Sequence, residues 1–357
     1  MRSLFILCFL MVLSAPDSFL SATDNILTCG NYVCEKNESE TYCPQDCEIP
    51  ERCKEIYAYH ENICLNQMGW QYIGTDVDGV KRKILWKGPS GGRWAHGAII
   101  ALHGGSGHAS NFCSGLRIGK PMEAFSRLAL QEGFAVFSLD SSYARATDNY
   151  GNSVGKRWDS LYQQKRKNID LPFIKKVITA VIPSMRPPGS NQSIFMTGIS
   201  NGGFMTTLAA AQFSNSLTAI APVSAGDPFS TYFDMSTHPF FERTCAPGVF
   251  RDSDTHQKIN TRDACRRQSI SRRPDINSSN NVENRLPFKQ FHHRGDGACD
   301  FSCMQKARDW LLKNSFKDEG AYILSKGRRK IASHFWQNEY NQSMIQFFKK
   351  YARLNAR

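Results

Sequence analysis

Long apolar runs are scarce in this chain of 357 residues. The longest spans residues 4–13 and follows Arg2, and ten residues are too few to cross a bilayer, which takes about 20. A short apolar core after a basic start predicts a secretory signal peptide over residues 1–22 rather than a membrane anchor, with cleavage after Ala22. We therefore expect the mature protein to be soluble, without a membrane span, and secreted.

Internal repeats, zinc-finger spacings and the basic–aromatic motifs of nucleic-acid-binding modules are also missing, so we expect no nucleic-acid partner. The formal charge is +12, unevenly spread. Residues 23–64 hold nine acidic and three basic side chains, which leaves +18 for residues 65–357. A basic body favours acidic polymers or anionic surfaces, or it simply provides a solvated surface.

Cysteine, by contrast, is plentiful. Eleven of the 12 cysteines lie beyond the signal peptide, an odd number, and most should pair in an oxidising compartment. Residues 29–47 read Cys-x4-Cys-x8-Cys-x3-Cys, which predicts a cysteine-rich module over residues 23–65 that disulfides hold together. We expect Cys53 and Cys64 to pair with each other or with this unit.

Acidic side chains in that module offer Ca²⁺ ligands, but a disulfide-stapled spacer is the favoured interpretation, and no metal is assigned. Asn-x-Ser sequons mark four candidate N-glycan sites on a secreted surface: Asn37, Asn191, Asn277 and Asn341.

Residues 66–357 alternate between apolar runs and helical spacing, which predicts an α/β domain with a mostly parallel sheet covered on both faces. Strands are expected at 84–86, 97–102, 134–139, 193–196, 219–224, 287–292 and 321–324, and helices at 121–132, 170–182, 204–211, 303–312 and 344–351. Residues 227–285 break the pattern and form either a lid or a solvated loop, which a Cys245–Cys265 disulfide would pin.

Residues 198–202 read Gly-Ile-Ser-Asn-Gly between an apolar run and a helix opening. Strand, sharp turn and helix form the setting of a nucleophile elbow, so Ser200 is the candidate nucleophile; a plain tight turn is the alternative. A serine needs a base, and His334 lies where that base is expected, after the last strand. Asp296 follows the penultimate strand and would orient His334, with Asp300 as its rival.

Attack on a carbonyl creates an oxyanion that needs preorganised donors. The backbone N–H of Asn201 is one candidate, because it opens the helix after the serine. The other is the N–H of Gly105, in the glycine-rich loop after strand 97–102.

Several ordered motifs resemble the secreted polyhydroxybutyrate depolymerase and feruloyl esterase type of α/β-hydrolase, over about residues 80–351: 102–105, Trp158, 168–174, 198–205, 219–226, Asp296 and 334–336. The resemblance implies an α/β-hydrolase fold and a carboxylic ester hydrolase without a cofactor. The chain departs from that family at Gly105, at Ser333 and in the acid turn 292–296.

These observations predict a serine esterase acting on polyhydroxybutyrate-type, feruloyl or acetyl polysaccharide esters. A serine peptidase with the same triad and a catalytically inactive extracellular binding protein are the alternatives. Trp158 and Trp336 are expected either to pack in the core or to form an aromatic surface near the site.

Overall fold

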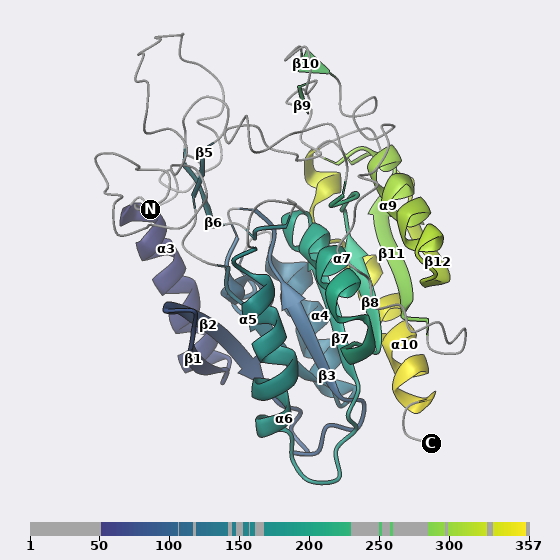
Figure 1. Cartoon of the computed structure of the whole chain (residues 1–357). Helices are drawn as coiled ribbons and strands as arrows, with labels where there is room; N and C mark the ends of the chain where they lie inside the picture. The colour runs from purple at the N-terminus through teal and green to yellow at the C-terminus, as the bar shows by residue number, and fades with distance from the viewer. Residues whose placement is uncertain are drawn as a thin grey trace.

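A central sheet of eight strands organises the computed structural model (Figure 1), in the order β1-β2-β4-β3-β7-β8-β11-β12. The structure describes residues 51–354 except 106, 117–118, 142–144, 148–152, 157, 161–167, 230–249, 252–257, 260–284, 297–298 and 327–330. The strands are β1 Gln71–Val77, β2 Val80–Lys87, β3 Ala98–Leu102, β4 Ala135–Leu139, β7 Ile194–Ile199, β8 Ala219–Val223, β11 Pro287–His293 and β12 Lys317–Leu324.

Strand β2 is antiparallel to β1 and to β4, and every other neighbouring pair in this sheet is parallel. The parallel strands β3, β4, β7 and β8 are buried along their whole length. This is why each is a continuous apolar run rather than an alternating one. The strand order is that of the α/β-hydrolase fold, so the predicted fold class is confirmed.

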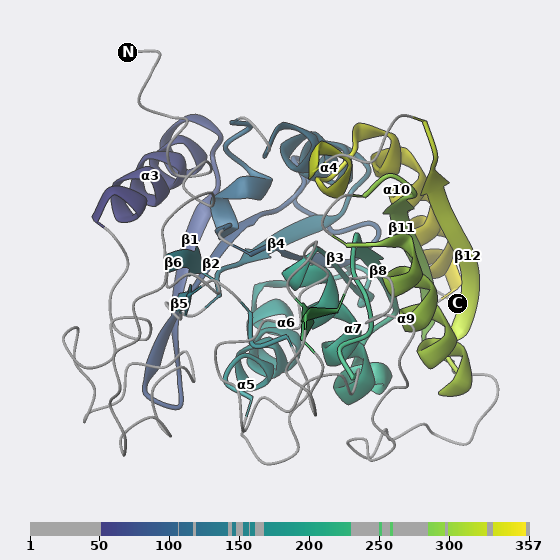
Figure 2. The ribbon, with the colours of Figure 1, turned by 90° about the horizontal axis from the view of Figure 1, so that it is seen from above.

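Helices cover both faces of the sheet (Figure 2). On one face α4 and α10 enclose a core with Phe125 and Phe348, and on the other α5, α7 and α9 enclose a core with Phe173, Leu208 and Trp310. The helical elements are α3 Glu51–Asn62, η1 Ile63–Gln67, η2 Ala109–Phe112, α4 Lys120–Gln131, α5 Leu171–Lys176, η4 Val177–Val181, α6 Ile182–Met185, α7 Asn201–Phe213, η5 Ser214–Ser216, α9 Phe301–Lys313, η7 Ile331–His334 and α10 Asn338–Leu354.

Short two-stranded sheets complete the described secondary structure: β5 Arg145–Thr147 with β6 Ser153–Lys156, and β9 Phe250–Arg251 with β10 Lys258–Ile259. Within the residues described, no helix is both long and apolar enough to cross a membrane.

Cys64 forms a disulfide with Cys113, across 49 residues of sequence. The expectation that Cys64 pairs with Cys53 or with the cysteine-rich unit is therefore wrong. The bond joins η1 to the turn after η2, and so it crosses the boundary drawn between residues 65 and 66.

Several expectations lie outside the described residues: the signal peptide 1–22, the unit 29–47, the Cys245–Cys265 pairing and most of 227–285, with the sequons at Asn37 and Asn277. The sequon at Asn341 is described, and this residue is only 6% exposed. Its amide nitrogen, the atom that a glycan would modify, donates to the Pro121 carbonyl at 3.0 Å, so a glycan there would break a buried contact.

Candidate active site

Ser200 sits at a sharp turn between β7 and α7. Its φ of 53° and ψ of −120° are rare for a residue with a side chain, and such backbone strain costs about 1–3 kcal/mol. Two backbone hydrogen bonds hold it: Ser200 N–H donates to Val223 C=O at 2.9 Å, and Phe204 N–H donates to Ser200 C=O at 2.9 Å. The side chain is partly exposed. A strained, accessible serine is what a nucleophile elbow requires.

Glycine is needed in this turn because backbone passes very close by. A Cβ at Gly202 would lie 2.3 Å from the carbonyl oxygen of His103 and 2.5 Å from that of Leu102. The first turn of α7 is therefore packed directly on the end of β3, which brings Ser200 beside the loop after that strand.

His334 and Asp296 lie 38 residues apart in sequence and meet in the structure. His334 Nδ1–H donates to the Asp296 carboxylate, at 2.8 Å from Oδ2 and 3.0 Å from Oδ1. His334 is 9% exposed and Asp296 is 1% exposed. With Nδ1 engaged, Nε2 is the nitrogen left to accept a proton, which is the arrangement of a base held by an acid.

Burial, the largest single effect, raises the pKa of Asp296, and it is opposed first by the imidazole of His334 and its hydrogen bond. The neighbouring His292 and the Cys299 N–H, which donates to Oδ1 at 2.7 Å, add to this opposing effect. The pKa of Asp296 is therefore lowered, and the group is an anion at neutral pH, as a partner for an imidazolium must be.

Asp300, the rival acid, has a different place. It caps α9, where its Oδ1 accepts from the Ser302 N–H at 3.0 Å and from the Ser302 hydroxyl at 2.8 Å. A side chain in this position satisfies backbone N–H groups that have no partner within the helix. The structure thus brings Asp296, and not Asp300, to His334.

The loop after β3 lies against the elbow. A Cβ at Gly104 would be 3.5 Å from the Cβ of Ser200, and one at Gly105 would be 3.9 Å from the Cβ of Asn201. A turn closes this loop, with Gly107 N–H donating to Gly104 C=O at 3.0 Å. Gly105 N–H is not part of that bond. Asn201 is the first residue of α7, where backbone N–H groups have no partner within the helix.

All these groups share one edge of the sheet. Ser200 follows β7, Gly104 follows β3, Asp296 follows β11 and His334 follows β12. Since these strands are parallel, their carboxyl ends lie at the same edge, which is where open α/β sheets place their ligands. The helix α7 that begins at Asn201 also favours negative charge there.

Both tryptophans named from the sequence are buried, Trp158 at 3% and Trp336 at 1% exposure. Trp336 packs on Phe112 and Phe125 and bonds to Asn341, so its role is in the core. Trp158 donates its indole N–H to the carbonyl of His103, in the loop after β3, at 2.9 Å. The sequence did not predict this contact, because no motif spacing indicates it.

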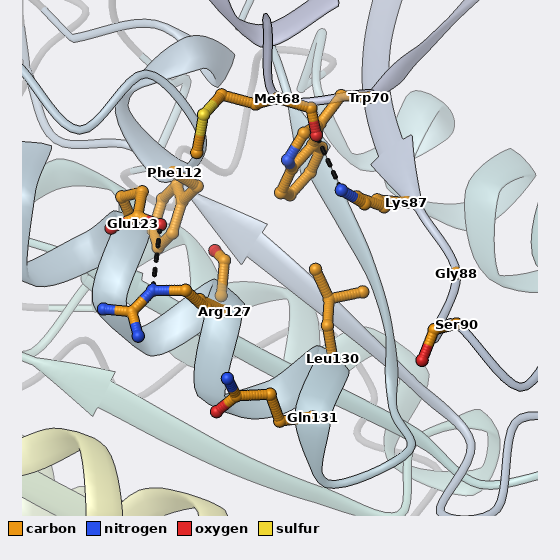
Figure 3. Close-up of a pocket in the computed structure, with 11 residues that line it drawn as sticks. Met68, Trp70, Lys87, Gly88, Ser90, Phe112, Glu123, Arg127, Leu130 and Gln131 are labelled. Carbon is orange, nitrogen blue, oxygen red and sulfur yellow. Dashed lines mark hydrogen bonds and ion pairs between the residues drawn. The ribbon is translucent and has the colours of Figure 1, made fainter.

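A cavity of about 270 Å³ opens elsewhere, between η1, the end of β2 and α4 (Figure 3). Trp70, Phe112 and Leu130 are among its lining residues. Its two cations are already engaged, Lys87 with the Met68 carbonyl at 2.6 Å and Arg127 with Glu123 at 3.3 Å. No histidine lines it, so it offers no base for a serine. Within the described ranges, no cluster of three or more His, Cys, Asp or Glu side chains is arranged to hold a metal ion.

No protein-family model matches the chain, and neither does any curated protein. Among solved structures, Est1E from Butyrivibrio proteoclasticus is similar at 15% identity, over 80% of this chain and 98% of that one, with a TM-score of 0.42. An S-formylglutathione hydrolase from Agrobacterium tumefaciens is similar at 13% identity, over 79% of this chain and 94% of that one, with a TM-score of 0.47.

An acylaminoacyl peptidase from Pyrococcus horikoshii is similar at 15% identity and a TM-score of 0.47, over 79% of this chain. This chain spans only 41% of that protein's length. The fold assignment rests on the strand order, and the interpretation of the site rests on the geometry above.

Proposed function

We propose that this protein is a serine hydrolase that cleaves carboxylic esters through Ser200, His334 and Asp296. The observation that carries the proposal is the buried His334–Asp296 hydrogen bond, at the sheet edge where the elbow presents Ser200. Core packing does not require a strained serine and a carboxylate-bound imidazole at the same edge of the sheet. Together they supply a nucleophile and its base.

In the first half-reaction, Ser200 Oγ attacks the ester carbonyl carbon while His334 Nε2 takes the hydroxyl proton. The tetrahedral oxyanion accepts hydrogen bonds from the N–H groups of Asn201 and Gly105. Asp296 stabilises the imidazolium that forms. Collapse breaks the bond between the acyl carbon and the alcohol oxygen, and the alcohol leaves with the proton from His334.

In the second half-reaction, water attacks the acyl-enzyme and gives a proton to His334 Nε2. The same two N–H groups hold the second oxyanion. When this intermediate collapses, Ser200 Oγ regains its proton from His334 and the carboxylic acid departs. No cofactor is needed in this sequence of steps.

For the substrate, we propose esters of the polyhydroxybutyrate, feruloyl-polysaccharide or acetyl-polysaccharide classes. The support for this is the set of sequence motifs between residues 80 and 351 that resemble esterases acting on such substrates. We also propose that the protein is secreted. The Cys64–Cys113 disulfide supports this, because such bonds persist in oxidising compartments.

Steady-state kinetics test the proposal on p-nitrophenyl acetate and butyrate against peptide anilides. We expect turnover of the esters, with Ser200→Ala lowering kcat by at least about 10⁴-fold, and little or no turnover of the anilides. Anilide turnover above that of the esters would favour a peptidase. A wild-type protein without activity on either would favour the binding-protein alternative.

A screen of the purified protein against hydroxybutyrate oligomers, feruloyl sugars and acetylated xylan then separates the three ester classes. Ser200→Ala is the matched control in each assay. Its loss of activity shows that turnover comes from this site and not from a contaminating esterase.

A further inference from the structure

Residues 158–160 are hydrogen-bonded both to Asn201 and to the loop that carries Gly105. The Asn201 side chain brackets the backbone of Trp158: its Oδ1 accepts from Trp158 N–H at 2.6 Å, and its Nδ2 donates to Trp158 C=O at 3.1 Å. The same Nδ2 donates to Ser160 Oγ at 2.7 Å. The residue that opens α7 is therefore bonded through its side chain to a segment more than 40 residues earlier in the chain.

On its other side, Trp158 reaches the loop that carries Gly105. The indole N–H donates to the His103 carbonyl at 2.9 Å, and the two rings lie 5.1 Å apart between centroids. His103 is fully buried and both of its ring nitrogens are used. Nδ1–H donates to Gly104 C=O at 2.7 Å, and Nε2 accepts from Ser141 N–H at 3.1 Å. His103 thus holds the loop and is not available as a base.

A buried carboxylate also anchors residues 158–160 to strand β2. Asp170 Oδ2 accepts from Asp159 N–H at 2.6 Å, and the other oxygen of that carboxylate pairs with the buried Arg82 on β2. Asp159 in turn accepts from Ile169 N–H at 3.0 Å. Trp158 is therefore fixed to the sheet as well as to both sides of the site.

We propose that Trp158 is a positioning residue that sets the separation between the Asn201 and Gly105 N–H groups. The proposal rests on the proposed function. Oxyanion donors act only when they lie at hydrogen-bond distance from the developing charge, and a misplacement of about 1 Å costs on the order of 100-fold in rate. A bridge bonded to both donor-bearing segments is placed to prevent that misplacement.

Trp158→Phe tests this, because it keeps an aromatic ring beside His103 and removes the indole donor, together with part of the buried ring volume. Trp94→Phe is the matched control. Trp94 is also buried, at 1% exposure, but it packs on Trp86 and Phe137 before β3, at the opposite end of that strand from Gly104. A merely structural role predicts the same kinetic behaviour from both variants.

The readout compares p-nitrophenyl butyrate with its thionoester, in which sulfur replaces the carbonyl oxygen. Sulfur is a weak hydrogen-bond acceptor, so the oxyanion donors stabilise the transition state of the thionoester only slightly. The kcat values are normalised to the fraction of Ser200 that a fluorophosphonate labels, so that misfolded protein does not count. Thermal unfolding is recorded for each variant.

For Trp158→Phe we expect oxoester kcat to fall about tenfold or more, KM to stay within about twofold, and the oxoester-to-thionoester ratio to fall in parallel with kcat. Trp94→Phe should lower thermal stability and leave kcat and this ratio near those of the wild type. Asn201→Ala removes the hydrogen bonds on the other side of Trp158. We expect it to show the same fall in oxoester kcat and in the oxoester-to-thionoester ratio, and it replaces Trp158→Phe as the test if that variant does not fold.

An unchanged ratio in Trp158→Phe and Asn201→Ala, with an active wild type, overturns this inference and leaves the proposed function standing. A wild-type protein that neither takes the fluorophosphonate label nor turns over the oxoester overturns both.

Discussion

At the scale of single residues, a second imidazole lies beside the candidate acid. His292 is fully buried, and its Nε2–H donates to Cys299 C=O at 3.0 Å, with Asp296 Oδ2 at 3.7 Å. Among the described residues, Nδ1 of this ring has no hydrogen-bond partner. Burial lowers the pKa of His292, although Asp296, the Cys299 carbonyl and Asp300 act in the opposite direction. The ring is therefore neutral in the folded protein.

This buried ring predicts an acid-sensitive fold. The unfolded chain binds a proton at His292 near pH 6.5, and the folded protein binds it only at lower pH, so stability is lost as the pH falls below about 6.5. His292→Gln keeps an amide donor near the position of Nε2 and cannot titrate. We expect the melting temperature to fall less between pH 7.5 and 5.5 in this variant than in the wild type, by differential scanning calorimetry. Parallel pH curves for the two proteins would contradict the prediction.

At the scale of elements, the turn between β7 and α7 depends on close packing. Gly202→Ala would drive a methyl group into the carbonyls at the end of β3. We expect it to lower the free energy of unfolding by about 3 kcal/mol or to give no soluble protein. Gly91→Ala is the matched control, since nothing lies within 4 Å of its added Cβ. Urea unfolding measures both, and equal stability of the two variants would show that the turn tolerates a side chain.

Elements with a strong local signal could be predicted from the sequence. The apolar runs at β3, β4 and β8 matched the structure within about a residue at each end, because strands buried on both faces need apolar side chains throughout. The run predicted for β7 ended at residue 196, three residues before the end of the strand at Ile199. The edge strand β1 was missed because most of its residues are exposed or half-buried, and pairing with β2 is what makes it a strand. The helix α10 begins at Asn338, six residues before the predicted start.

At the scale of the whole molecule, the sequence predicted the kinds of residue that make up the site better than it predicted which individual residues are in contact. Asp296 and Asp300 are both plausible acids by spacing, and only the folded chain separates them. The Cys64–Cys113 pair and the bridge through Trp158 depend on contacts between distant segments, which cysteine counts and local motifs do not encode.

The whole account depends on Ser200 being activated by His334 at the carboxyl edge of the sheet. Its most direct test is to treat the wild type, Ser200→Ala and His334→Ala with a fluorophosphonate and map the adduct by peptide mass spectrometry. The account predicts one adduct, on Ser200, that is absent from Ser200→Ala and forms far more slowly in His334→Ala. An adduct on another residue, no adduct in the wild type, or equal labelling rates in the wild type and His334→Ala would contradict it.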